Sequence, residues 1–128
     1  MDSKSNSKKT VLIIDDDTVL LNMYKQKIIS SGYNVVTSID GEEAFDVFQK
    51  EDVDLIICDI MLPRVSGIEF LEKIRKTKKG KNLPVIAWTN LKDTEVKEKA
   101  MKLSVKEFLI KGSLTLDQVV ETVKKYLP

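Results

Sequence analysis

Six polar side chains stand at the ends of four apolar runs in this sequence: Asp15, Asp16, Asp17, Asp59, Thr89 and Lys111. Carboxylates packed together repel one another and raise one another's pKa unless a cation neutralises them. A hard divalent cation such as Mg²⁺ does this well, because its protein ligands are oxygen atoms. A carboxylate beside such a cation can also act as the nucleophile in phosphoryl transfer. If these side chains converge, their types predict a Mg²⁺ site suited to phosphoryl-transfer chemistry.

The apolar runs have the length and composition of short strands. They are Val11–Ile14, Tyr33–Val36, Val53–Cys58, Val85–Trp88 and Phe108–Ile110. Several are continuous rather than alternating, which is typical of parallel strands buried on both faces. Ligands bind beyond the carboxyl ends of the strands in an open parallel sheet. We therefore expect Asp15, Asp16, Asp59 and Lys111 to meet at one edge of the sheet.

Amphipathic segments with helix-start signals separate the runs. The candidate N-caps, some of them in capping boxes, are Asp17, Asp40, Ser66 with Glu69, Asp93 or a neighbour, and Thr115 with Gln118. Gly32 stands where a glycine would end the first helix. The chain thus contains five β–α units, and right-handed crossovers predict an α/β fold with a parallel sheet between helices.

The composition fits one folded domain and excludes several kinds of site. The chain has 128 residues and a formal net charge of +1 with both signs interspersed, so a general attraction to nucleic acid is not indicated. The absence of histidine excludes histidine-based catalysis and nearly every zinc site, and the one cysteine excludes an intrachain disulfide. With no membrane span and no secretory signal in view, we expect a cytoplasmic protein, with a disordered leader at 1–9 and a domain at 10–127.

One stretch, Lys73–Lys81, carries six positive charges in nine residues. It could bind phosphate or nucleic acid. No helix-turn-helix pattern and no flanking aromatic residue accompanies it, so we interpret it as a solvated helix end followed by a loop.

The sequence resembles the receiver domains of the two-component response-regulator family, of the single-domain chemotaxis type. The resemblance spans residues 10–127 and rests on four ordered segments, namely Ile13–Asp17, Ile56–Pro63 with Gly67, Trp88–Thr89, and Phe108–Lys111. It implies a doubly wound, flavodoxin-like five-stranded parallel sheet in the order 2-1-3-4-5 with five helices. It also implies a signalling domain, which is not an enzyme beyond catalysing its own phosphorylation and slow autodephosphorylation.

The resemblance implies a role for each acidic residue, position by position. Asp59 would accept a phosphoryl group from the phosphohistidine of a sensor histidine kinase or a phosphotransfer protein. Asp16 and Asp59 would bind Mg²⁺ directly, together with the backbone carbonyl of Met61. Asp15 would act on the metal through a water molecule.

It also implies how the phosphoryl group would be sensed. Lys111 would pair with the acyl phosphate, and Thr89 would donate a hydrogen bond to one of its oxygens. Phe108 would be an aromatic switch that turns inward when Thr89 moves toward the phosphoryl group. The alternative for Phe108 is a plain core aromatic on an apolar strand, and the sequence does not separate the two.

The chain departs from the family's pattern at two positions. Gly112 stands where the family usually has a proline in a cis bond after the lysine. A cis bond before a non-proline residue costs about 2.5–4 kcal/mol, so we expect a trans Lys111–Gly112 bond. Asn90 stands where the family usually has a small residue after the threonine.

Two other functions remain as alternatives. Asp15-x-Asp17 after an apolar strand resembles the first motif of the haloacid-dehalogenase phosphatases, in which the first aspartate is the nucleophile and the second the general acid. That family needs a further acidic pair on a later strand, and only Asp117 and Glu121 follow Lys111. The other alternative is a receiver-like adaptor that signals without phosphorylation.

No output domain follows in this sequence, so we expect the protein to act through contact with a downstream protein, without direct nucleic-acid or membrane binding. It would be a monomer or a weak, phosphorylation-dependent dimer. The expected readout surface is formed by the fourth helix, the fifth strand and the last helix, with exposed residues Lys97, Lys99, Lys106, Glu107 and Lys124.

Overall fold

The computed structural model describes residues 8–61, 66–89, 94–111 and 113–128. Strands and helices alternate along the chain. The strands are β1 Thr10–Ile14, β2 Asn34–Ser38, β3 Leu55–Asp59, β4 Val85–Thr89 and β5 Glu107–Ile110. The helices are α1 Thr18–Ser30, α2 Gly41–Lys50, α3 Gly67–Arg75, α4 Thr94–Lys102 and α5 Leu116–Tyr126.

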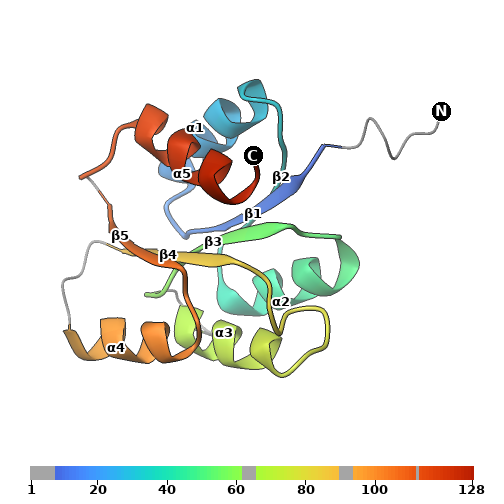
Figure 1. Ribbon diagram of the computed structural model, residues 1–128, viewed down its shortest axis with the longest axis vertical. Helices are drawn as coiled ribbons and strands as arrows, with labels where there is room; N and C mark the ends of the chain where they lie inside the picture. The colour runs from blue at the N-terminus through green and yellow to red at the C-terminus, as the bar shows by residue number, and fades with distance from the viewer. Residues whose placement is uncertain (1–7, 62–65, 90–93, 112) are drawn as a thin grey trace.

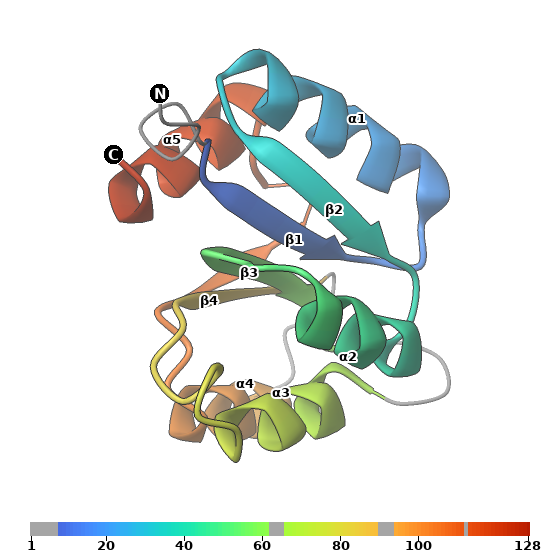
Figure 2. The ribbon, with the colours of Figure 1, turned by 90° about the vertical axis from the view of Figure 1, so that its right-hand side faces the viewer.

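The strands form one parallel sheet in the order β2-β1-β3-β4-β5, as the resemblance implied. Helices α1 and α5 cover one face of this sheet, and α2, α3 and α4 cover the other (Figure 1). Among the described strands, β2 lies at one edge of the sheet, next to β1 (Figure 2). The predicted doubly wound α/β fold with five strands and five helices is confirmed.

The sheet divides the hydrophobic core into two layers. Alternate residues of the central strands point into each layer, so that Leu12 and Ile14 pack toward α2 and α3 whereas Val11 and Ile13 pack toward α1 and α5. Every residue of β3 and β4 is buried, but those of β5 are only half-buried. The continuous apolar runs therefore mark the central strands of the sheet.

The second strand begins one residue later than predicted and extends to Ser38. Tyr33, which we expected at its start, still closes the preceding turn, where its backbone N–H donates to Ile28 O at 3.4 Å. The Tyr33 hydroxyl donates a buried hydrogen bond of 2.6 Å to Leu127 O, at the end of α5. Tyr33 therefore has a tertiary role that its apolar neighbourhood in the sequence did not indicate.

The predicted helix signals act as expected. The confirmed N-caps are Asp17, Asp40, Ser66 in a capping box with Glu69, and Thr115 in a capping box with Gln118. Gly32 follows the end of α1 with a φ of +104°, a left-handed conformation that favours glycine. The predicted start of the fourth helix at Asp93 lies outside the described residues.

The basic stretch Lys73–Lys81 is not uniformly solvated, because one of its side chains, Arg75, acts as a clamp that binds backbone carbonyls of two loops. Arg75, at the end of α3, donates hydrogen bonds to the carbonyls of Gly80 and Leu83 in the following loop and of Leu103 and Ser104 beyond α4. A guanidinium suits this arrangement because it presents several donors in one rigid plane. Arg75 thus joins the loops that lead into β4 and β5.

Lys79 also binds a backbone carbonyl of another segment. Its ammonium donates to Phe48 O at 2.6 Å, near the carboxyl end of α2, where a cation is favoured by the helix dipole. The interpretation of Lys73–Lys81 as a helix end and loop is therefore supported, but two of its cations bind backbone carbonyls of other segments.

We expect Arg75→Met to lower the free energy of unfolding by about 2–3 kcal/mol, because several carbonyls of the two loops lose a charged donor. Urea denaturation of the variant measures the change. Lys78→Met, which removes an exposed cation from the same loop, is the matched control and should change stability by less than about 0.5 kcal/mol. Equal stability of the two variants would contradict a clamping role for Arg75.

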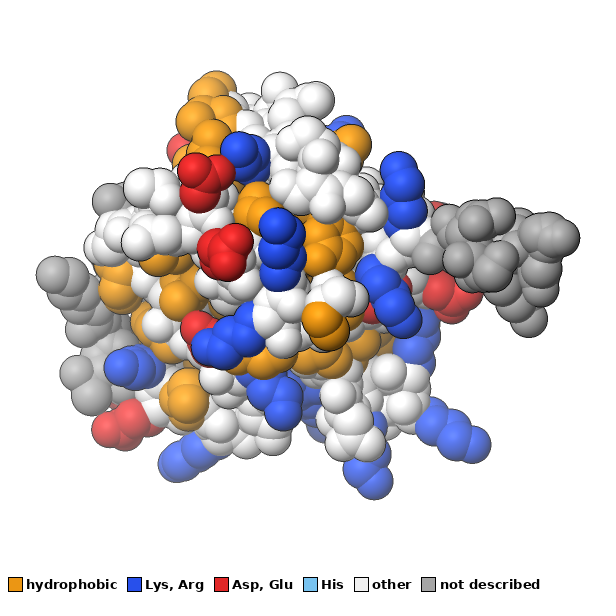
Figure 3. All heavy atoms as spheres, turned by 45° about the horizontal axis from the view of Figure 1, so that its top comes forward, with side chains coloured by type: hydrophobic (Ala, Val, Ile, Leu, Met, Phe, Trp, Pro, Cys, Tyr) orange, Lys and Arg blue, Asp and Glu red, His pale blue; other side chains and the backbone are white. Residues whose placement is uncertain are grey.

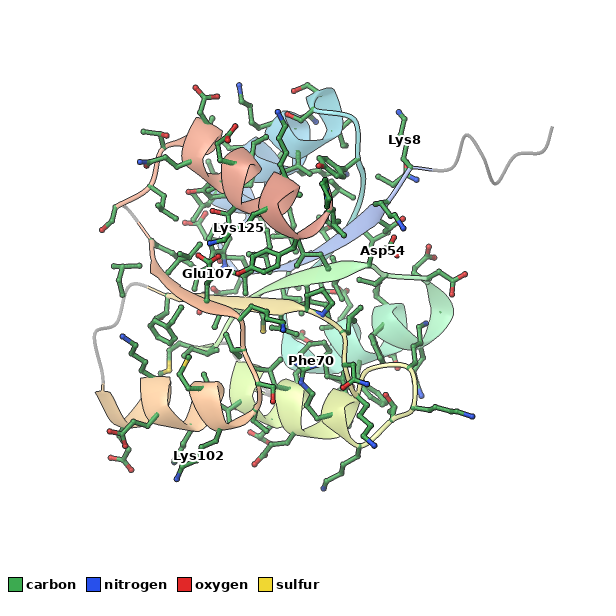
Figure 4. The ribbon with its side chains drawn as sticks, in the orientation of Figure 1. Lys8, Asp54, Phe70, Lys102, Glu107 and Lys125 are labelled. Atoms are coloured by element: carbon green, nitrogen blue, oxygen red, sulfur yellow. The ribbon has the colours of Figure 1, made fainter. Side chains whose placement is uncertain are left out.

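The surface agrees with the near-neutral charge. Basic, acidic and apolar side chains are interspersed on the face seen in Figure 3. Glu107 of β5 and Lys125 of α5 point toward one another, and Lys125 Nζ lies 2.7 Å from Glu107 Oε2 (Figure 4). Among the described residues, no helix combines the length and apolar character needed to cross a membrane.

Candidate functional site

The predicted site residues meet at the carboxyl edge of the sheet. The two central strands β1 and β3 are neighbours, with Ile14 paired to Cys58, so Asp15 and Asp59 leave the sheet side by side. The chain runs from β1 outward to β2 and then crosses back to β3, which places the site where the strand order reverses. Such a switch point is the usual ligand-binding position in open α/β sheets.

Three carboxylates lie close together at this edge. One oxygen each from Asp15, Asp16 and Asp59 lies within 4.8 Å of the others. Asp15 and Asp59 are buried, whereas Asp16 is exposed. The convergence predicted from the topology is confirmed, and the donor set, which consists of carboxylate oxygens with one side open to solvent, is of the kind that binds Mg²⁺.

A lysine ammonium already lies between two of these acids. Lys111 Nζ is 2.6 Å from Asp15 Oδ2 and 2.7 Å from Asp59 Oδ2. The Lys111 side chain is 7 % exposed, so both ion pairs are largely shielded from solvent. The mutual repulsion expected of the acids is therefore partly offset by Lys111 in the protein itself.

The remaining oxygens of the two buried acids accept backbone hydrogen bonds. Asp15 Oδ1 accepts from the N–H of Asp17 at 2.9 Å, and Asp59 Oδ1 accepts from the N–H of Met61 at 2.9 Å. Each carboxylate is thus held by one local turn and by Lys111. Asp17 itself caps α1, since its Oδ1 accepts from the N–H of Leu20 at 3.1 Å.

The environment shifts the pKa of both partners of the central ion pair. Burial raises the pKa of Asp59, although the hydrogen bonds from Lys111 and Met61 oppose the shift. Burial also acts to lower the pKa of Lys111, but its hydrogen bonds to Asp15 and Asp59 outweigh this, and the pKa is raised. Lys111 is therefore charged at neutral pH.

Gly67 lies against the backbone of Asp59 and Ile60. A Cβ atom added at Gly67 would lie 2.4 Å from both Asp59 O and Ile60 Cα. The first residue of α3 therefore packs directly on the backbone of the acid-bearing segment, an approach that only glycine allows.

The remaining predicted residues occupy the rim of the site. Thr89 is buried at the end of β4, and its carbonyl accepts from the N–H of Lys111 at 2.8 Å, which joins the ends of β4 and β5. Phe108 is half-buried on β5 and packs against the core layer shared with α4, and Lys97 Nζ lies 5.7 Å from its ring centroid. The Met61 side chain is 48 % exposed.

Some of the expectations cannot be compared with the structure. Pro63, Asn90 and Gly112 lie outside the described residues, as do residues 1–7 of the predicted leader. The predicted trans bond between Lys111 and Gly112 is among these.

Trp88 is a site neighbour that we did not single out for its chemistry. It pairs with Asp59 across the β3–β4 ladder, and Lys111 Nζ lies 5.7 Å from the centroid of its ring. The sequence signal was available, since Trp88 directly precedes Thr89, but a buried aromatic on an apolar strand is by default a core residue.

Comparison with known proteins agrees with this geometry. The sequence model of the family "Response regulator receiver domain" matches residues 11–124. The chain belongs to this family. Receiver domains are signalling domains with an acidic pocket at this edge of the sheet, and the predicted resemblance is confirmed.

Several relatives match this receiver domain along nearly its whole length. It is 29% identical over 119 residues to the polar-differentiation response regulator DivK of Brucella ovis, covering 93% of this chain and 96% of DivK. The structure of the CheY-like response regulator receiver domain protein from Methanospirillum hungatei JF-1 has a TM-score of 0.88 at 28% identity, covering 94% of both chains. That of Vibrio cholerae chemotaxis protein CheY4 has a TM-score of 0.86 at 27% identity, covering 94% of this chain and 99% of CheY4.

Other relatives of the receiver domain are longer proteins. The probable transcriptional regulator ycf27 of Guillardia theta is 32% identical over 111 residues, which cover 87% of this chain but 42% of ycf27. The chain thus spans less than half the length of these curated relatives.

The buried acid should make the stability of the receiver domain depend on pH. Because burial raises the pKa of Asp59, this carboxyl keeps its proton to a higher pH in the folded protein than in the unfolded chain, so its contribution to stability in EDTA should fall as the pH rises above about 4. Glu107, whose pKa is lowered by its hydrogen bonds with Lys125 and Tyr126, contributes in the opposite sense, so the effect of Asp59 is read from the difference between wild type and Asp59→Asn. Lys111 adds no slope in this range, because its raised pKa matters only near pH 10 and above. In urea denaturation from pH 4 to 7, stability should fall less with pH for Asp59→Asn than for wild type, whereas equal slopes of the two proteins would contradict the argument. Asp52→Asn, at an exposed position, should keep the wild-type slope.

Proposed function

We propose that Asp59 accepts a phosphoryl group from the phosphohistidine of a histidine kinase or phosphotransfer protein. The observation that supports this most strongly is the triad of Asp15, Asp59 and Lys111, in which two buried carboxylates pair with one lysine close to the exposed Asp16. An oxygen of Asp59 attacks phosphorus, the bond from phosphorus to the histidine nitrogen breaks, and the imidazole leaves with its electron pair.

The acids Asp15, Asp16 and Asp59 would hold Mg²⁺, with the backbone carbonyl of Met61. The ion, when bound, offsets the negative charge of the phosphoryl oxygens. Lys111 must release Asp59 Oδ2 before that oxygen can react, and its ammonium then pairs with the new phosphoryl group. Asp15 keeps its hydrogen bond to the N–H of Asp17 and so remains a fixed part of the site.

Thr89 and Phe108 would convert the modification into a change of shape. A phosphoryl group adds a charge of about −1.5 to −2 beside Thr89, whose hydroxyl can donate to it. Thr89 O is bonded to the N–H of Lys111, so a shift of one strand end is passed to the other. The half-buried Phe108 would then fill the space beside Thr89, and the surface of α4, β5 and α5 would present the result to a downstream protein.

We place this activity in the cytoplasm, with the protein as a monomer or a weak, phosphorylation-dependent dimer. Its catalysis would be limited to its own phosphorylation and dephosphorylation. The phosphatase alternative is disfavoured by Asp17, the residue it needs as general acid, because Asp17 is engaged in capping α1.

The test is phosphorylation by acetyl phosphate, read by intact mass with and without Mg²⁺. Wild-type protein should gain one phosphoryl group only when Mg²⁺ is present, and Asp59→Asn should gain none. Asp52→Asn, an exposed acid outside the site, is the matched control and should behave as wild type. A phosphoryl group mapped to Asp15 would favour the phosphatase, and an unmodified wild type would favour the adaptor.

A further inference from the structure

The ammonium group of Lys111 has a third neighbour besides its two carboxylates. Its Nζ lies over the Trp88 ring, 5.7 Å from the centroid, and Trp88 is fully buried. A cation within about 6 Å of an indole face is attracted by the negative charge of that face, and the attraction is stronger where water is excluded. The side chain of Lys111 is thus bounded by acids on one side and by an aromatic surface on the other.

The indole itself is held in place. The ring of Tyr24, from α1, packs against it with centroids 4.7 Å apart and planes tilted by 55°. The register of β3 and β4 puts Trp88 directly beside Asp59. These contacts fix the orientation of the Trp88 ring relative to Asp59, the carboxylate that pairs with Lys111.

Core packing alone does not account for an indole at this position. The Trp88 Nε1 atom is buried and finds no hydrogen-bond partner among the described residues. An unpaired buried N–H costs free energy, and an aliphatic side chain would fill the layer without it.

We propose that Trp88 is a positioning residue that holds the Lys111 ammonium at the acid cluster through its aromatic face. The proposal rests on the proposed function, because it concerns the lysine that would meet the phosphoryl group. When Asp15, Asp16 and Asp59 hold a divalent cation, their charge is shared with it and they attract Lys111 less. The attraction between the indole face and the ammonium is not reduced by the divalent cation, so the indole then keeps the ammonium within reach of Asp59.

Fluorinated tryptophan tests this with a small change of shape, since each fluorine weakens the negative charge of the ring face and adds much less volume than a methyl group. Trp88 is the one tryptophan of the chain, so biosynthetic labelling alters this side chain alone. The series is tryptophan, 5-fluoro-, 5,7-difluoro- and 4,5,6,7-tetrafluorotryptophan. Phosphorylation by acetyl phosphate at saturating Mg²⁺ should slow progressively, by about threefold to tenfold at the end of the series. The Mg²⁺ concentration for half-maximal rate should stay unchanged.

A second readout needs neither metal nor phosphorylation. In the metal-free protein the ε-methylene protons of Lys111 should be shifted upfield by the ring current of Trp88, and Trp88→Leu should remove the shift. Trp88→Phe, which shrinks the side chain about as much but keeps an aromatic face, should retain part of the shift and phosphorylate faster than Trp88→Leu.

The outcomes separate this proposal from the proposed function. If unlabelled protein is not phosphorylated at all, the proposed function is wrong, while the ring-current shift still tests the contact. If phosphorylation occurs but its rate is constant across the fluorinated series, or the methylene protons show no upfield shift, Trp88 is a core residue and does not position Lys111.

Discussion

Replacing Gly67 with alanine is expected to lower the free energy of unfolding by about 3 kcal/mol and to slow phosphorylation of Asp59 severely. The added methyl group would overlap Asp59 O and Ile60 Cα, which are backbone atoms and cannot turn away as a side chain could. The better helix propensity of alanine recovers about 1 kcal/mol at most. Either α3 or the segment that carries Asp59 must therefore shift.

Urea denaturation and acetyl-phosphate labelling of Gly67→Ala measure the two effects. Gly32→Ala is a useful control, because Gly32 has a positive φ of +104° but open space around a Cβ, and it lies far from the acids in the α1–β2 turn. That variant should lose stability, by about 1 kcal/mol, yet label at the wild-type rate. If Gly67→Ala also labels normally, the close approach does not position the acid.

Replacing Lys111 with methionine is expected to destabilise the metal-free protein by about 3–5 kcal/mol at neutral pH, because Asp15 and Asp59 lose a buried counter-ion. The deficit should shrink as the pH is lowered, when the acids take up protons and their charges disappear. It should also shrink with added Mg²⁺, since a cation bound by the same acids replaces the missing charge.

Thermal or urea denaturation in EDTA and in Mg²⁺ follows these changes. Lys106→Met removes an exposed cation from the segment before β5 and should change stability by less than about 0.5 kcal/mol under all conditions. A Lys111→Met protein as stable as wild type in EDTA would mean that the two acids are solvated or protonated without the lysine.

The fold could be predicted because its signals are local and periodic. Continuous apolar runs at Val11–Ile14 and Val85–Trp88 are what buried parallel strands require, and caps such as Ser66 and Thr115 set where helices begin. The strand boundaries were off by one or two residues, both in the central strand β3, which begins at Leu55 and not at Val53, and in the edge strand β2, which begins at Asn34 and not at Tyr33. Tyr33 forms a hydrogen bond with Leu127 instead of starting the strand, and a contact over 94 residues leaves no mark on the neighbouring sequence.

Part of the site could also be predicted from the sequence, and part could not. The convergence of Asp15, Asp16, Asp59 and Lys111 followed from strand order, because parallel strands bring their carboxyl ends to one edge. The double ion pair of Lys111 was not predictable, since it depends on side-chain reach within the pocket. The contact of Trp88 with the Lys111 ammonium was not predictable for the same reason. Nor were the hydrogen bonds of Arg75 to backbone carbonyls of other segments.

The hydrogen bond from Tyr33 to Leu127 also determines how a mechanical force on the C-terminal end of α5 is transmitted to the sheet. It ties the last turn of α5 to the residue that precedes β2, on the far side of β1 from β3, the strand that carries Asp59. A pulling force applied at Pro128 would therefore reach the β2 edge through Tyr33 rather than peel α5 from the sheet alone. The acid cluster, at the opposite ends of the strands, would be spared the first displacement. A reporter attached beyond α5 should for this reason leave the geometry of the acid cluster undisturbed.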